Sequence, residues 1–163
     1  MRGVERTRGA AGFTLVELLI VVSIIFVLAA LAVPNFLRAR LAANEAAVAS
    51  SCRSINTAEF TYNAFYAQGY SGTLAQLGPP AGGPPTAEAA DLIDDQLASG
   101  RRSGYSFNYA PGGLVGATYA TYQLQASPSV PEGTGTRYFF TDPSGVIRAE
   151  VGAPAGPSSS PIP

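Results

Sequence analysis

The chain has 163 residues, a formal net charge of −1 and 47% hydrophobic residues, a composition that suits one small domain plus an apolar segment. All ten basic residues are Arg and there is no His, so imidazole catalysis, lysine Schiff-base chemistry and histidine metal ligation are excluded. Its single cysteine, Cys52, excludes an intramolecular disulfide and paired-cysteine metal sites, and the near-neutral charge argues against a nucleic-acid partner.

The chain begins with a short polar leader, residues 1–12, whose charged residues are Arg2, Glu5, Arg6 and Arg8. This excess of arginine favours a cytoplasmic N-terminus. The next charge is Glu17, after which Leu18 to Leu37 form 20 consecutive uncharged residues. A helix of that length covers the roughly 30 Å of a membrane's hydrocarbon core. We therefore expect residues 13–36 to form a membrane-spanning helix.

Glu17 stands at the start of this apolar segment, where an ionised side chain is costly unless it has a partner. Thr14 and Glu17 have the spacing of a capping box, in which the threonine caps the helix and the glutamate reaches back over the first turn. The helix dipole also favours a carboxylate there. Two simpler interpretations, a plain membrane anchor and a secretory signal peptide cleaved at Ala30-Leu31-Ala32, leave the glutamate unexplained.

The stretch Gly12-Phe13-Thr14-Leu15-Val16-Glu17, followed by an apolar run, closely resembles the N-terminal cleavage and methylation motif of type IV prepilins and type II secretion pseudopilins. The resemblance implies that a prepilin peptidase cuts between Gly12 and Phe13, and that Phe13 becomes an N-methylated terminus. It also implies that Glu17 pairs with the terminal amine of a neighbouring subunit. Such a pair neutralises two buried charges and rewards one stagger between the helices.

The helical pattern continues beyond the membrane segment. Pro34 lacks an amide hydrogen, so we expect a kink or a local loosening of the helix near Ala30. Residues 37–66 are expected to form the amphipathic half of the same helix, with Gly69 as its stop. Its apolar stripe consists of Leu37, Leu41, Val48, Cys52, Ile55, Ala58, Tyr62 and Phe65. The stripe predicts packing against the chain's own C-terminal sheet, with Cys52 buried as a small apolar residue.

Residues 67–102 are predicted to form a loop with one short helix. Gly and Pro are frequent from 69 to 85, and Thr86 is the expected N-cap of a helix over TAEAADLIDDQLAS that ends at Gly100. The acidic residues of this helix are Glu88, Asp91, Asp94 and Asp95. Because they lack the glycine-turned loop of a calcium site, we expect a solvated helix face and no metal.

The C-terminal part has the two-residue period of β-strands. SFNYA, ATYATYQLQA, TRYFFT and GVIRAEV predict an antiparallel sheet within residues 103–152, and Asp142-Pro143-Ser144-Gly145 predicts a tight turn between the last two strands. Residues 153–163, rich in Pro and Ser, are expected to be disordered. A long helix packed on a small antiparallel sheet is an α+β fold of the pilin-like type.

These features favour a structural subunit of a type IV pilus-like filament over an enzyme, because no base accompanies the serines and no nucleophile elbow occurs. The resemblance implies four partners: other copies of the chain, a prepilin peptidase, the assembly machinery of a pilus or of type II secretion, and inner-membrane lipid. It implies no cofactor. The expected location is the bacterial inner membrane, with a single span and a cytoplasmic N-terminus, and then a periplasmic or extracellular filament.

Two departures from the family pattern keep a type II secretion pseudopilin and a minor pilin open as alternatives. Many type IV pilins close a C-terminal loop with two cysteines, and this chain has only Cys52. Major pseudopilins usually carry a DPWG-type segment and a calcium loop, whereas residues 142–145 lack tryptophan. A protein with an ordinary secretory signal peptide is the less favoured alternative.

Overall fold

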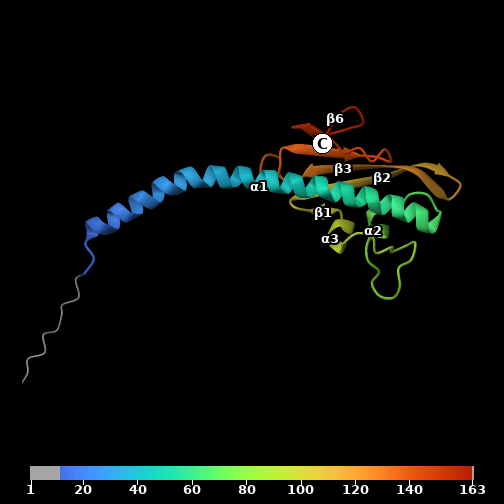
Figure 1. The fold of residues 1–163 in the computed structure, drawn as a ribbon, viewed down its shortest axis with the longest axis horizontal. Coiled ribbons are helices and arrows are strands. Elements are labelled where there is room, and N and C mark those ends of the chain that lie inside the picture. The colour runs from blue at the N-terminus through green and yellow to red at the C-terminus, as the bar shows by residue number, and fades with distance from the viewer. Residues whose placement is uncertain (1–11, 163) are drawn as a thin grey trace, which may run out of the picture. The chain divides into compact units, whose positions relative to one another are not determined.

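The computed structural model describes residues 12–162 (Figure 1). The leader predicted over residues 1–12 therefore lies outside the described residues, apart from Gly12. The chain divides into two compact units, Met1–Arg38 and Ala39–Pro163, and the helix α1 (Leu15–Tyr66, 52 residues) runs from the first into the second. This long helix and a C-terminal antiparallel sheet confirm the predicted α+β fold.

In the first unit, α1 exposes its apolar side chains on every side. The large apolar residues from Leu15 to Leu37 are all exposed, with exposed fractions between 39% at Val22 and 79% at Leu15. Pro34 lies inside the helix, which continues past it. The predicted kink stays a prediction, while the helical conformation expected across this segment is confirmed.

The polar side chains of the uncharged run are satisfied inside the helix itself. The Ser23 hydroxyl donates to the Leu19 carbonyl (2.7 Å), and the Asn35 amide donates to the Leu31 carbonyl (3.2 Å). An unsatisfied polar group is costly in hydrocarbon, so these internal hydrogen bonds suit a helix that has apolar surroundings.

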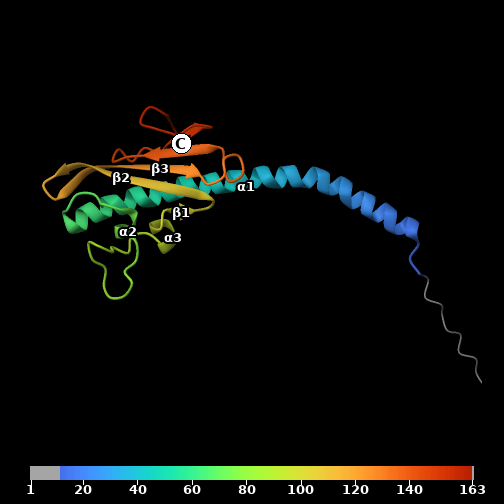
Figure 2. The ribbon, with the colours of Figure 1, turned by 180° about the vertical axis from the view of Figure 1, so that it is seen from behind.

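The second unit contains a six-stranded antiparallel sheet in which each strand pairs with the next one along the chain. The strands are β1 (Arg101–Arg102), β2 (Tyr105–Val115), β3 (Thr118–Pro128), β4 (Arg137–Thr141), β5 (Arg148–Val151) and β6 (Ser160–Pro161). Figures 1 and 2 show the second half of α1 lying along one face of this sheet. The predicted partner of the amphipathic half is therefore confirmed.

The core of the second unit lies between α1 and the sheet. The central residues of the predicted stripe are buried there, namely Val48, Cys52, Ile55, Ala58 and Tyr62. They share one core with the sheet residues Tyr105, Leu124 and Phe139. Burial raises the pKa of the Cys52 thiol to about 12, so this cysteine is an inert core residue, as expected.

The two ends of the predicted stripe are exposed. The exposed fraction is 50% for Leu37 and 81% for Phe65. In the last turn of α1, Tyr66 packs against the core in place of Phe65, and its ring centroid lies 5.0 Å from that of Tyr62. Phe65 and Tyr66 lie three and four residues after Tyr62, and both spacings place a side chain on the same helix face. The sequence therefore did not show which of the two packs against the sheet.

The helix ends at Tyr66, as predicted, but Ala67 rather than Gly69 makes the stop. Ala67 adopts a left-handed φ of 52°, and its amide donates to the Asn63 carbonyl (3.1 Å). Gly69 serves a different purpose, because a Cβ at this position would lie 2.2 Å from the carbonyl oxygen of Tyr119. It is needed for the close approach of two backbones.

Two buried polar side chains of α1 fasten the helix to the rest of the unit. The Asn56 amide donates to the Thr141 hydroxyl (2.9 Å), and the Tyr122 hydroxyl donates to Asn56 Oδ1 (2.9 Å). The fully buried Glu59 carboxylate accepts from the Ser71 amide (3.0 Å) and from the Ser71 hydroxyl (2.6 Å). Buried polar groups are tolerated when they are hydrogen-bonded, so these contacts help to specify how the helix packs on the sheet.

The single helix predicted after Thr86 is wrong except at its last turn. The structure instead has two short helices, α2 (Leu74–Leu77) and α3 (Asp95–Ala98). The amides of residues 90–93 donate to the carbonyls of residues 76–78, and these longer-range hydrogen bonds replace helical ones. They also bring apolar side chains of the segment into the core, and this burial outweighs local helix propensity.

The disordered tail predicted over residues 153–163 is contradicted for its described part. β6 pairs with β5, the Ile162 amide donates to the Ile147 carbonyl (2.9 Å), and Ala155 is buried. The composition of the tail indicated disorder, but the edge of β5 supplies hydrogen-bond partners that composition does not reveal. The tight turn predicted over residues 142–145 is confirmed by the hydrogen bond from Gly145 to Asp142 (2.9 Å), although it precedes β5 and not the last strand.

Glu59 makes the stability of this unit depend on pH. Burial raises the pKa of Glu59, and hydrogen bonds from Ser71 and Tyr109 only partly oppose this effect. Because the folded pKa lies above the unfolded one, the stabilisation is full below the unfolded value of about 4.3 and is lost as the pH rises through the folded pKa. We expect the free energy of unfolding of Glu59→Gln to fall less with rising pH than that of the wild-type chain. The free energy of unfolding, measured in detergent micelles at about pH 5 and about pH 8, provides the test.

The matched control is Glu150→Gln, which removes an exposed carboxylate from β5. It should leave the pH dependence of the wild-type chain unchanged. An equal slope in the wild-type chain and in Glu59→Gln would contradict the role given to Glu59.

Candidate functional site

The first turn of α1 is closed by Thr14 and Glu17. The Thr14 amide (2.9 Å) and the Thr14 hydroxyl (2.7 Å) both donate to Oε2 of Glu17, and the Glu17 amide donates back to the Thr14 hydroxyl (3.2 Å). This reciprocal arrangement is the predicted capping box, and it satisfies donors that a helix N-terminus otherwise leaves free. The carboxylate therefore has a structural role within a single chain.

Only one oxygen of this carboxylate is used. All hydrogen bonds to Glu17 within residues 12–162 go to Oε2, so Oε1 accepts none from that part of the chain. The side chain is also exposed. The cap therefore leaves an acceptor that another cation can approach without breaking the contacts to Thr14.

Gly12 and Phe13 precede the cap and are exposed. The Phe13 side chain is 86% exposed, and a Cβ built at Gly12 would meet no atom within 4 Å. Packing within the described chain therefore does not demand a glycine at position 12.

The apolar half of α1 follows directly. Among the described residues, α1 is the helix that is long and apolar enough to cross a membrane, and none of its most apolar stretch is buried. A signal sequence near the N-terminus meets the same criteria. Arg38 and Arg40, both exposed, mark the far end of this stretch. Arginine side chains at such a position can extend towards lipid headgroups.

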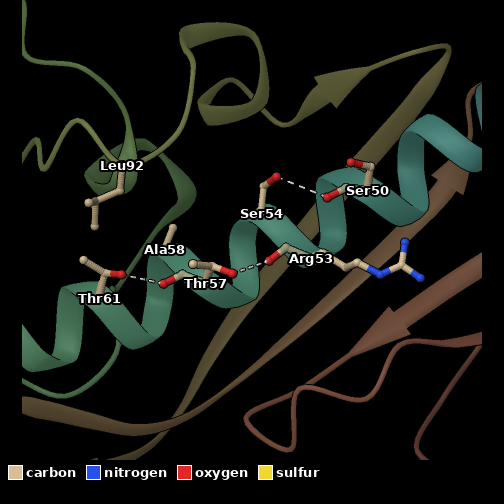
Figure 3. Close-up of a pocket in the computed structure, with 7 residues that line it drawn as sticks. All are labelled: Ser50, Arg53, Ser54, Thr57, Ala58, Thr61 and Leu92. Atoms are coloured by element: carbon tan, nitrogen blue, oxygen red, sulfur yellow. Dashed lines mark hydrogen bonds between the residues drawn. The ribbon is translucent and has the colours of Figure 1, made fainter.

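One of the hollows in the second unit lies on the outer face of α1 (Figure 3). Its volume is about 370 Å³, and it is lined by Ser50, Arg53, Ser54, Thr57, Ala58, Thr61 and Leu92. The hydroxyls of Ser54, Thr57 and Thr61 each donate to the backbone carbonyl four residues earlier. None of these lining residues is a general base, so the groove lacks the parts of a hydrolytic site.

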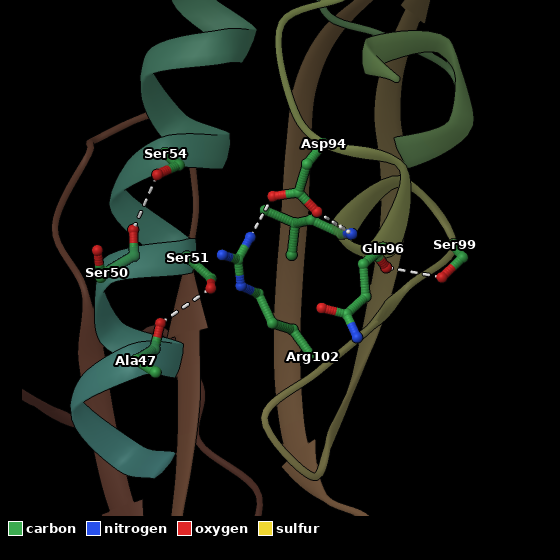
Figure 4. Close-up of polar contacts among 9 residues, drawn as sticks. Ala47, Ser50, Ser51, Ser54, Asp94, Gln96, Ser99 and Arg102 are labelled. Atoms are coloured by element: carbon green, nitrogen blue, oxygen red, sulfur yellow. Dashed lines mark hydrogen bonds and ion pairs between the residues drawn. The ribbon is translucent and has the colours of Figure 1, made fainter. Parts of the chain in front are cut away.

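The acidic residues of the loop do not form a metal site. Within residues 12–162, no three His, Cys, Asp or Glu side chains gather closely enough to hold an ion. Asp94 instead caps α3, where it accepts from the Leu97 amide (2.9 Å), and it pairs with Arg102 (Figure 4). The hydrogen bond from Leu97, followed by the contact with Arg102, holds the pKa of Asp94 below its usual range. The expected N-cap, Thr86, does not begin a helix.

Sequence patterns pointed to Gly12, Phe13, Glu17 and Pro34, but they did not reveal the polar residues that hold the second unit together. The structure places Gly12, Phe13 and Glu17 within two turns of chain and Pro34 well along the same helix. Glu59 carried a detectable signal, because it is an acid between two positions of the apolar stripe, Ile55 and Tyr62. A charge at a core position needs a buried partner.

Comparison with known proteins identifies a known motif in the N-terminal segment. Residues 7–33 match the family model described as the prokaryotic N-terminal methylation motif. The chain is 58% identical over 41 residues to the type IV wide pilus major component PilA4 of Thermus thermophilus. That match covers 25% of this chain and 31% of the relative, so it spans about a third of the relative's length. No solved structure matches the chain significantly.

These findings confirm the resemblance seen at Gly12 to Glu17. The segment carries a prepilin-type N-terminal motif, and the relative is named as a pilus component. The name of the relative, a pilus component, agrees with the expectation of a structural protein as opposed to an enzyme. The methylation motif and the capping box overlap, since Thr14 and Glu17 belong to each.

Thr14 is expected to hold the first turn of α1 through its hydroxyl. Thr14→Ala removes one donor to Glu17 and the acceptor of the Glu17 amide, so that amide should exchange its hydrogen roughly fivefold faster. Hydrogen exchange of the chain in detergent micelles measures this change. Thr14→Ser keeps the hydroxyl and should behave as the wild-type chain does. Equal exchange rates in Thr14→Ala and Thr14→Ser would show that the cap does not depend on the hydroxyl.

Proposed function

Because its N-terminal segment is of the prepilin type, we propose that this chain is a structural subunit of a type IV pilus-like filament. The observation that carries the proposal is an exposed apolar helix that begins at a prepilin motif and continues into a folded unit. The apolar half anchors the subunit in the inner membrane before assembly. It then forms the filament core with the same half of other copies.

Processing would precede assembly. Arg2, Arg6 and Arg8 keep the leader in the cytoplasm, where a prepilin peptidase cuts between Gly12 and Phe13. Phe13 then carries the new amine, which the same enzyme methylates. The exposure of both residues supports this step, since none of residues 14–162 covers the peptide bond between them.

Assembly would move α1 from lipid to a bundle of helices. Both surroundings are apolar, so the hydrophobic effect contributes little, and packing and polar contacts must set the stagger between subunits. The amine of Phe13 and the carboxylate of Glu17 on neighbouring copies supply such a contact. Leaving either charge buried without the other costs about 3 to 5 kcal/mol. Since Thr14 occupies only Oε2, Glu17 can keep its cap while Oε1 accepts from the neighbour.

A pseudopilin of a type II secretion system is the alternative that shares this mechanism. One observation favours it over a pilin whose C-terminal loop is closed by a disulfide: the single cysteine, Cys52, is buried in α1, and β6 is held by strand pairing and packing. The name of the relative, a pilus major component, favours the pilus. A minor pilin would prime or cap the polymer and would be scarce in it, so subunit abundance in sheared filaments separates these cases.

Glu17→Gln should be processed normally and assemble poorly. The amide retains an acceptor for the Thr14 cap but cannot neutralise the neighbour's amine, and a buried uncompensated charge lowers the stability of each contact. We expect filament yield to fall at least about tenfold, measured as polymer sheared from cells that express the variant at the wild-type level. Full yield from Glu17→Gln would remove Glu17 from the mechanism.

Gly12→Val is expected to block processing without disturbing the fold. The open space around Gly12 accommodates the side chain, so only the peptidase should respond. Gly82→Val is the matched control, because Gly82 also has no atom within 4 Å of its Cβ position and lies in the second unit. Mass spectrometry of the mature N-terminus gives the readout. A wild-type protein that begins at Phe13 with one added methyl group supports the proposal, and one that begins at Val33 supports a secretory signal peptide.

A further inference from the structure

The last strand, β6, forms one edge of the sheet. β6 lies against the outer edge of β5, with Pro161 opposite Arg148 and Ser160 opposite Ala149. Ile162 extends the contact through its amide, which donates to the Ile147 carbonyl (2.9 Å). We call residues 153–162 the tail and the outer edge of β5 the tail site.

Side chains fix the tail at three points. Nη1 of Arg148 donates to the Ser159 carbonyl (3.2 Å). Ile162 packs partly buried against the core, and Ala155 is 3% exposed. A turn between Gly156 and Ser159 presets the tail for this position, since the Ser159 amide donates to the Gly156 carbonyl (3.0 Å). The site therefore suits an extended Ser- and Pro-containing segment with an aliphatic side chain at the position of Ile162.

This contact is short enough to be reversible. Pro161 lacks an amide hydrogen, and β6 faces only the first two residues of β5. Nε of Arg148 is buried and has no acceptor among the described residues, which offsets part of the gain from Nη1. A cavity of about 360 Å³ also remains between the tail and the strands, beside Arg137, Glu150 and Val151. Such a strand can leave its site without dismantling the core.

The other edge of the sheet does not need such a cover. β1 pairs with only the first two residues of β2, and further along β2 stand Pro111 and then Gly113, whose φ is 61°. A proline and a left-handed glycine interrupt an edge strand and prevent further pairing. β5 contains neither residue. When the tail leaves, β5 is therefore the sheet edge that is open to a new strand.

We propose that the tail site is a strand-binding site which the tail of a second copy of this chain can fill in place of the chain's own tail. The contacts at Ser159 and Ile162 do not depend on the covalent link through residues 152–154, where Ala153 and Pro154 are exposed. A tail from another molecule makes the same contacts, and exchange of identical elements joins two copies at little energetic cost. The proposal stands on the second unit alone and does not require that α1 forms a filament.

The test uses a chain that ends at Gly152 and a fluorescent peptide with the sequence of residues 153–163. We expect saturable binding of this peptide to the shortened chain in detergent micelles, followed by fluorescence anisotropy. The full-length chain should bind far less, because its own tail competes. A peptide carrying Ile162→Asp should bind at least about tenfold more weakly, since its charge would have to enter the apolar contact. A peptide carrying Ser158→Asp is the matched control, because Ser158 is exposed.

The proposal is overturned if the full-length and shortened chains bind the peptide equally, or if the two aspartate peptides bind alike. Should circular dichroism reveal that the shortened chain has lost its sheet, full-length Ile162→Asp replaces it, since this chain keeps its tail but releases it. In that variant the amide at position 162 should exchange quickly, and added wild-type peptide should bind. Slow exchange at position 162, or the absence of peptide binding, would then refute the proposal.

Discussion

The hydrogen bonds between Thr14 and Oε2 of Glu17 close the first turn of α1, and the exposed apolar half of the helix starts from this cap. A helix leaves its first amides without partners in the helix; here the Glu17 carboxylate accepts from the Thr14 amide, and the Thr14 hydroxyl accepts from the Glu17 amide. The same side chain is therefore tolerable in a lone subunit and available to another. The cap uses Oε2, so it is compatible with the proposed assembly contact through Oε1 of the same carboxylate.

The two halves of α1 form one continuous helix but differ in what surrounds their apolar side chains. The first half exposes apolar side chains on every side and satisfies Ser23 and Asn35 internally, so it needs an apolar surrounding from outside the chain. The second half buries one face and places Asn56 and Glu59 in the core, where sheet and loop residues complete their hydrogen bonds. The second half thus folds against its own chain, whereas the first half leaves its apolar side chains exposed.

The sequence predicted features that depend on local pattern and missed those that depend on distant partners. The apolar run, the Thr14–Glu17 spacing, the strands and the turn after Thr141 follow from periodicity and turn chemistry, and the structure contains them. The prediction of a helix after Thr86 was wrong because the amides of residues 90–93 donate to the carbonyls of residues 76–78, at the end of α2. The prediction that the tail is disordered was wrong for the same reason, because the tail is ordered by its pairing with β5. The processing roles of Gly12 and Phe13 and the assembly role of Glu17 rest on partners outside the chain, so they stay predictions, as does the kink at Pro34.

The burial of Cys52 makes the chain suitable for labelling at an introduced cysteine. The sole native thiol is sealed inside the core and, with its raised pKa, scarcely ionises at neutral pH. A cysteine introduced at an exposed position, such as Ser158 or Glu132, would therefore be the one that maleimide dyes reach. The wild-type background already permits site-selective labelling, so spin labels and fluorophores can be attached without first replacing a residue of the core.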